Sequence, residues 1–161
     1  ACSSALPPEA IAAWQKPGDA ETDPRRWILS YAILAPHSHN MQAWLVDLSV
    51  PDEITLFIDR SRLLPETDPF SRQMMMSQGT FLELLDLAAK QKGLSAKIAL
   101  FPQGIFPPDT VDARPTARIR LVADGIDRMS REEAGYWLGM AVHRANPRRV
   151  LAALRILLTS N

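Results

Sequence analysis

The residues with the clearest chemical potential lie close together in residues 36–44. Between a proline and a tryptophan, this stretch carries two imidazoles, a hydroxyl and two carboxamides: His37, His39, Ser38, Asn40 and Gln42. Side chains of these types donate and accept hydrogen bonds. A flat heteroaromatic ring with carbonyls and ring nitrogens, a flavin above all, requires recognition of that kind along its edge. The stretch therefore indicates a binding site for such a ring.

The spacing of His37 and His39, two residues apart, would also suit a metal ion. A third ligand is harder to find, because His143 is the one remaining histidine and Asp47, the nearest acid in sequence, lies in an expected strand. Loop histidines more often serve as hydrogen-bonding groups, so we expect no metal.

Familiar catalytic signatures are absent from the sequence. It contains no G-x-S-x-G elbow, no G-x-G-x-x-G after a strand and no phosphate loop ending in Gly-Lys-Ser or Gly-Lys-Thr. The single cysteine, Cys2, excludes an internal disulfide and has no neighbour in sequence that would activate a thiolate. We expect no catalytic acid, base or nucleophile.

The composition describes one ordinary domain. The chain has 161 residues, of which 47% are hydrophobic, and its 18 basic residues balance 18 acidic ones. This balance argues against a nucleic-acid or anionic-membrane partner, and no apolar run reaches the length of a membrane span. The opening residues 1–5, small around Cys2, resemble a chain from which a signal sequence was removed. Cytoplasmic and exported, periplasmic locations both stay open.

The elements that must position these residues alternate between helices and strands. Proline, N-cap and glycine signals predict helices at residues 9–15, 25–35 and 70–91, a further helix from residue 130 to 143 and another from residue 146. Alternating apolar residues predict a hairpin of residues 44–50 and 54–58, followed by strands at 96–101 and 116–122. The fold class is α+β, with an antiparallel-rich sheet packed with helices.

The stretch Ala35-Pro36-His37-Ser38-His39-Asn40-Met41-Gln42-Ala43-Trp44 resembles the Ala-Pro-Ser-Ser-x-Asn-x-Gln-Pro-Trp motif of the nitroreductase family. It departs from the motif at His37 and Ala43, where serine and proline are usual. Residues 59–69, Arg72 and residues 79–87 are similar to the Acg-type branch, in which two nitroreductase-like lobes share one longer bacterial chain. The resemblance covers roughly residues 10–103.

This resemblance implies an FMN-binding site between two lobes or subunits. Carried over by position, it places Ser38, Asn40 and Gln42 against the flavin or its ribityl chain, with His37 as a local substitute contact. Arg72 is a further candidate, whose structural alternatives are a solvated residue at the helix start or a salt bridge to Asp68.

The family's Arg-rich phosphate segment has no counterpart here. Arg25 and Arg26, at the positive end of the helix before the motif, are substitute candidates. Residues 158–161 resemble the start of the segment that opens the second lobe in the Acg-type branch. We therefore expect residues 1–161 to form a single nitroreductase-like domain, the N-terminal lobe of a longer protein, which forms a homodimer or pairs with the second lobe.

Three functions remain open at this stage. The first is an FMN-dependent oxidoreductase that passes electrons from NAD(P)H to nitroaromatic or quinone-like acceptors, for which no side chain need act as acid or base. The second is a non-catalytic protein that binds or sequesters flavin. The third is an interaction module without a cofactor.

Overall fold

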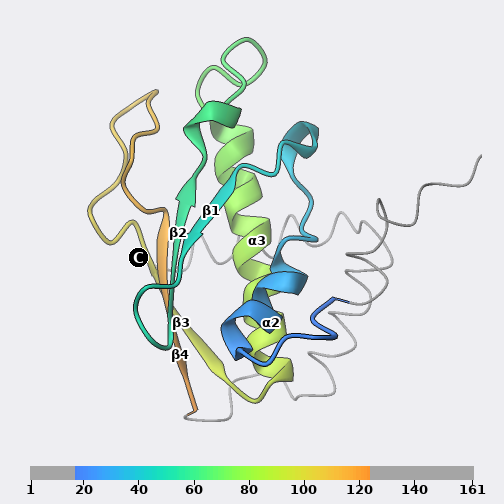
Figure 1. The fold of residues 1–161 in the computed structure, drawn as a ribbon. Helices are drawn as coiled ribbons and strands as arrows, with labels where there is room; N and C mark the ends of the chain where they lie inside the picture. Colours follow the sequence, from blue (N-terminus) through green and yellow to red (C-terminus); the bar gives the residue numbers. More distant parts are fainter. Residues whose placement is uncertain (1–16, 124–161) are drawn as a thin grey trace, which may run out of the picture.

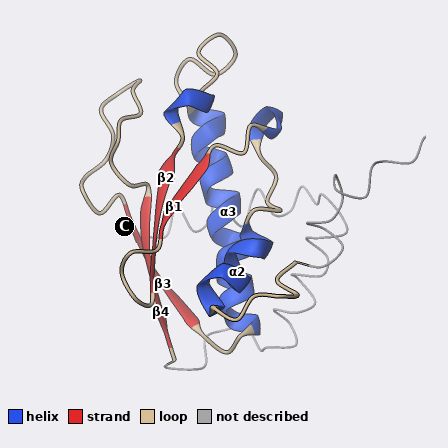
Figure 2. Cartoon of the chain, viewed as in Figure 1, coloured by secondary structure: helices blue, strands red, loops and turns tan. Residues whose placement is uncertain are grey.

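Two helices lie against one face of a four-stranded antiparallel sheet in residues 17–123, the part of the chain that the computed structural model describes (Figure 1). Figure 2 shows the helices gathered on one side of the strands. The α+β prediction is confirmed. The helices expected at residues 9–15, at 130–143 and from 146 lie outside the described residues.

Helix α2 (Pro24–Ala32) begins at the predicted N-cap Asp23, whose side chain accepts from the N–H group two residues further on at 2.8 Å. It ends three residues before the predicted position. The N–H groups of Leu34 and Ala35 donate to carbonyls three rather than four residues back, and Pro36 disfavours helical geometry in the residue before it.

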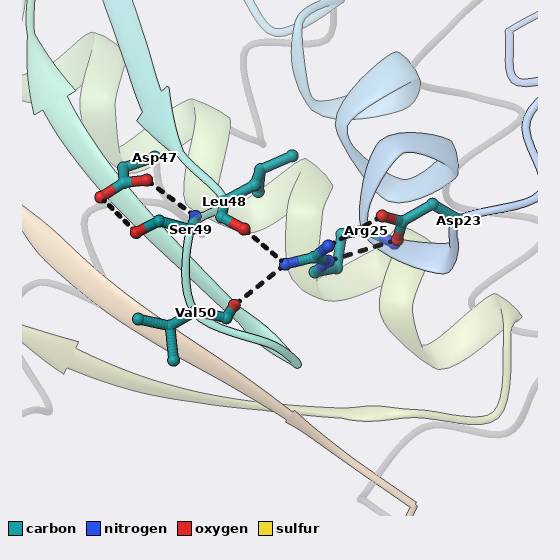
Figure 3. A network of polar contacts seen from close by, with 6 residues as sticks. All are labelled: Asp23, Arg25, Asp47, Leu48, Ser49 and Val50. Carbon is teal, nitrogen blue, oxygen red and sulfur yellow. Dashed lines mark hydrogen bonds and ion pairs between the residues drawn. The ribbon is translucent and has the colours of Figure 1, made fainter.

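Strands β1 (Trp44–Asp47) and β2 (Glu53–Ile58) form the predicted antiparallel hairpin. The prediction that β1 continues to Val50 is wrong. The carbonyls of Leu48 and Val50 instead accept hydrogen bonds from Arg25 Nη1, each at 2.9 Å (Figure 3). In this register the Leu48 carbonyl faces away from β2. The Ser49 N–H, which would pair with β2 in a longer strand, donates instead to Asp47 Oδ1 at 2.8 Å, so the hairpin pairing ends after Asp47 (Figure 3).

Helix α3 (Arg72–Gln91) is the predicted central helix, although it begins two residues later than expected. Ser71 has a left-handed φ of 52° and leaves the preceding Phe70 outside the helix. The buried carboxylate of Asp68 caps the helix, because it accepts from the first helical N–H at 2.8 Å and from that of Met74 at 3.0 Å.

Strands β3 (Ser95–Leu100) and β4 (Ala117–Val122) complete the sheet in the order β1-β2-β4-β3, and their predicted positions are confirmed to within one residue. The main core lies between α3, α2 and the sheet. Its fully buried members include Ile28, Ile54, Leu56, Phe81, Leu85 and Ile119. At the first turn of α3, Met74 is buried and Met75 is half-buried.

Candidate functional site

Residues 37–43 form a tight loop that joins the end of α2 to β1 (Figure 1). A short 3₁₀ turn spans Ser38–Asn40. The backbones of His39, Asn40 and Gln42 are left-handed, with φ values of 48°, 53° and 52°. Such a backbone costs a non-glycine residue about 1 kcal/mol or more. The loop therefore depends on its surroundings to keep this shape.

The first half of α3 supplies much of that support. Thr80 Oγ1 donates to the Pro36 carbonyl at 2.7 Å, and the Ser38 N–H donates to Ser77 Oγ at 3.0 Å. Ser38 Oγ donates to Gln73 Oε1 at 2.8 Å. These contacts connect residues about forty positions apart in sequence and bind the loop to the face of α3.

The segment after β2 holds the loop from another side. Arg62, in the 3₁₀ turn Arg60–Arg62, donates through Nη1 to the Met41 carbonyl at 2.9 Å. Its Nε lies 3.2 Å from a carboxylate oxygen of Asp59. The Asp59 N–H donates to the Ala43 carbonyl at 3.0 Å.

The imidazole of His37 lies between the two ends of the loop and contacts both. Its Nε2 accepts from the Ala43 N–H at 3.1 Å, and its Nδ1 lies 3.0 Å from the Ser38 carbonyl. The ring meets Trp44 edge to face, with centroids 4.8 Å apart. Burial lowers the pKa of His37, and the Ser38 carbonyl opposes this effect. Within residues 17–123, no three histidine, cysteine or acidic side chains gather as metal ligands would.

The two carboxamides of the loop lie together. Gln42 Nε2 donates to Asn40 Oδ1 at 2.8 Å. Among the hydrogen bonds of the described residues, this one leaves both Nδ2 hydrogens of Asn40, the Oε1 of Gln42 and one Nε2 hydrogen without a protein partner. The pair therefore offers donors and an acceptor side by side.

The arginines named from the sequence have different surroundings. Arg25 places four of its five N–H donors on Asp23 and on the two carbonyls after β1 (Figure 3). Arg26 is exposed and lines a groove of about 590 Å³ between α2 and β1. Both stand at the start of α2, whereas the loop follows its end. They are the second and third residues of this nine-residue helix, so the rise of the helix from them to its last residue is about 10 Å.

Arg72 begins α3, at the same end of the sheet as the loop. Its side chain is exposed, and its backbone N–H, rather than its guanidinium, contacts Asp68 at 2.8 Å. Its guanidinium carbon lies 5.1 Å from the centre of the Phe70 ring. The adjacent Gln73 contacts Ser38, which places Arg72 beside the residue that binds the loop.

The relatives found by comparison with known proteins include three from Mycobacterium tuberculosis. Two carry the name "Putative NAD(P)H nitroreductase": Rv3131, 30% identical over 126 residues, and acg, 29% identical over 127 residues. The third is "Uncharacterized protein Rv3127", 34% identical over 120 residues. The matches cover 78%, 72% and 66% of this chain but 33%, 38% and 35% of those proteins. These similarities support the nitroreductase family.

The chain thus spans about a third of the length of these three relatives. A model described as a domain of unknown function, DUF7680, matches residues 112–160, most of which lie outside the described part. No helix within residues 17–123 is long and apolar enough to cross a membrane.

The loop has the donor set that the flavin of a nitroreductase-like protein would need. The pyrimidine edge of a flavin presents carbonyl acceptors beside a ring N–H donor, and the carboxamides of Asn40 and Gln42 offer the complement of both. The structure brings His37, Ser38, Asn40, Gln42 and, nearby, Arg72 to one end of the sheet. It does not bring Arg25 and Arg26 to that place.

Four supporting residues were missed in the sequence as parts of the site. Gln73, Ser77 and Thr80 follow one another at spacings of four and three on α3, so they share the helix face toward the loop. Their spacing shows that they share a face, but not which segment that face meets. Arg62 lies in the stretch resembling the Acg-type branch, yet nothing in the sequence shows that it reaches Met41.

Proposed function

We propose that this chain is the N-terminal lobe of an FMN-dependent oxidoreductase of the nitroreductase family, which passes electrons from NAD(P)H to nitroaromatic or quinone-like acceptors. The observation that carries the proposal is the paired carboxamides in the strained loop 37–43. They occur in a chain similar to proteins that bear the nitroreductase name. Each of those relatives is about three times as long as the part matched here, which supports a second lobe.

The chain's own residues would bind and orient the cofactor. Asn40 Nδ2 is available to donate to a ring carbonyl, and Gln42 Oε1 is available to accept from the ring N–H. Ser38 and His37 hold the loop in shape, through Gln73 and through the Ala43 N–H. FMN would supply the hydride acceptance and electron transfer for which side chains are unsuited.

The phosphate of FMN requires a cation. Of the three candidate arginines, Arg72 lies nearest to the loop in the fold, because its neighbour Gln73 contacts Ser38. Arg26 is exposed but stands at the opposite end of α2, and Arg25 has one N–H donor left. We assign the phosphate to Arg72 first and to Arg26 second.

The surface around β1 supports pairing with a second lobe or a second copy of this chain. β1 is an edge strand of the sheet. Leu45 and Val46 on this strand are 51% and 41% exposed, and Ile33 near the groove is 43% exposed. Successive strand residues point to opposite faces, so Val46 shares the groove with Ile33 and Leu45 lies on the other face. Exposed apolar side chains on both faces of an edge strand are typical of a strand that a partner covers.

The proposal is tested by titrating FMN into the protein encoded by the complete gene. Asn40→Asp replaces the Nδ2 donor proposed for the ring carbonyl with a carboxylate oxygen. Gln42→Glu keeps an acceptor but replaces the Nε2 group that donates to Asn40 Oδ1, so this hydrogen bond between the two side chains is lost. We expect each variant to weaken FMN binding about tenfold or more. Gln103→Glu, which adds the same charge at an exposed position in the loop between β3 and β4, is the matched control and should bind as the unchanged protein does. Equal affinities for all four proteins would contradict the assignment of this loop.

Turnover is tested separately with the FMN-loaded protein. NAD(P)H should bleach the bound flavin, and a nitroaromatic or quinone should restore its colour. Flavin that stays oxidised with both nicotinamides would favour a protein that only binds or sequesters flavin.

A further inference from the structure

We propose that His37 is a proton-controlled positioning residue, which holds the loop of residues 37–43 in its flavin-binding shape when neutral and releases it when protonated. This inference rests on the proposed function, because the loop it controls is the one assigned to FMN. His37 itself need not touch the flavin.

The imidazole of His37 joins the two ends of the loop through one hydrogen bond. His37 begins the loop and Ala43 ends it, and the 3.1 Å hydrogen bond from the Ala43 N–H to Nε2 joins the two ends. The residues with left-handed backbones, including Asn40 and Gln42, lie between these ends. Loss of the hydrogen bond between His37 and Ala43 would therefore change the positions of the two carboxamides.

The partners of the ring determine its protonation state. The Ala43 N–H can only donate, so Nε2 must be the unprotonated nitrogen that accepts. The proton of the neutral ring is therefore on Nδ1, where it faces the Ser38 carbonyl. A second proton on Nε2 would point directly at the Ala43 N–H. Because Ala43 is fully buried, its N–H could not turn to water in place. The protonated imidazole of His37 therefore cannot keep the hydrogen bond to the Ala43 N–H.

The surroundings of the ring disfavour the cation as well. The ring packs on Trp44 and lies half-buried, and burial is the main cause of its lowered pKa. Two charged side chains that face this region from the adjoining elements are cationic: Arg62, which donates to the Met41 carbonyl, and Arg72, beside Phe70. The nearby acid Asp59 is paired with Arg62.

The direction of the pH effect follows from this geometry. The closed loop requires neutral His37, so protons compete with FMN below the pKa of the imidazole. The dissociation constant of FMN should be constant at higher pH and should rise as the pH falls through the lowered pKa of His37. One competing proton sets a limit of about tenfold per pH unit.

The test measures FMN affinity between about pH 5 and pH 8 for the unchanged protein, His37→Gln and His39→Gln. In H37Q the introduced amide oxygen can accept from the Ala43 N–H without titrating, so we expect this variant to lose the added pH dependence. His39 is exposed in the same loop and serves as the control, so H39Q should retain it. The phosphate of FMN also titrates, near pH 6, but equally for all three proteins. Identical pH profiles for the unchanged protein and H37Q would overturn the inference.

A second measurement keeps the inference separate from the proposed function. In NMR spectra without flavin, the Ala43 amide signal should shift with the same midpoint as the His37 imidazole. If no FMN binds at any pH, the proposed function fails. If the Ala43 amide and the His37 imidazole nevertheless titrate together, the role of His37 in holding the two ends of the loop is still supported. An Ala43 signal that ignores the titration of His37 would overturn that role, whether or not FMN binds.

Discussion

Two adjacent arginines at the start of α2 differ in what they contact. Arg25 forms an ion pair with Asp23 at 2.9 Å and donates to the carbonyls of Leu48 and Val50 (Figure 3). Arg26 is exposed on the groove beside β1. From the sequence both are equal candidates for the phosphate, because two neighbouring arginines do not show which guanidinium is hydrogen-bonded within the protein.

This difference predicts different effects of the two alanine variants. Arg25→Ala should lower the urea midpoint of unfolding clearly, since it removes the tie between α2 and the β1–β2 turn. Arg26→Ala should leave that midpoint nearly unchanged. Urea unfolding followed by circular dichroism measures both. A midpoint that falls equally in both variants would contradict the role assigned to Arg25.

At the scale of elements, the sequence predicts most of the described fold. Period-two alternation places β2, β3 and β4 within one residue of their observed positions, and the Asp23-Pro24 signal places the start of α2. The misplaced ends have tertiary or backbone causes. β1 stops early because the Ser49 N–H donates to the Asp47 side chain rather than to β2, a local turn that period-two alternation does not reveal.

The site was predictable only in part for the same reason. Polar residue types in residues 37–42 indicate hydrogen-bonding chemistry, and the resemblance names the family that the relatives support. The role of His37 as a tie to the Ala43 N–H depends on a left-handed backbone in between, which no local rule predicts for His39 or Gln42.

Asp68 offers a prediction for helix α3. Its buried carboxylate accepts from two N–H groups of the first turn, so Asp68→Ala should lower the free energy of unfolding by about 1–2 kcal/mol. Asp68→Asn retains one acceptor oxygen and should cost less. Glu66→Ala, exposed in the same loop, should change stability by less than about 0.5 kcal/mol. An unchanged free energy of unfolding in D68A would show that the cap does not stabilise α3.

For the whole molecule, the proposed second lobe and the apolar surface around β1 belong together. The chain spans about a third of its relatives, and Leu45 and Val46 lie exposed on an edge strand. If FMN lies between two lobes, as the family resemblance implies, the loop of residues 37–43 supplies one wall of the site and the partner supplies the other.

The most direct test of FMN binding is the visible absorption spectrum of the protein from the complete gene, recorded as it leaves a gel-filtration column after incubation with FMN. We predict flavin absorption bands that travel with the protein peak at a fixed ratio of flavin to chain, and a much reduced ratio for the Asn40→Asp, Gln42→Glu double variant. A folded protein that elutes colourless, with all added FMN in the small-molecule fraction, would contradict the proposed function.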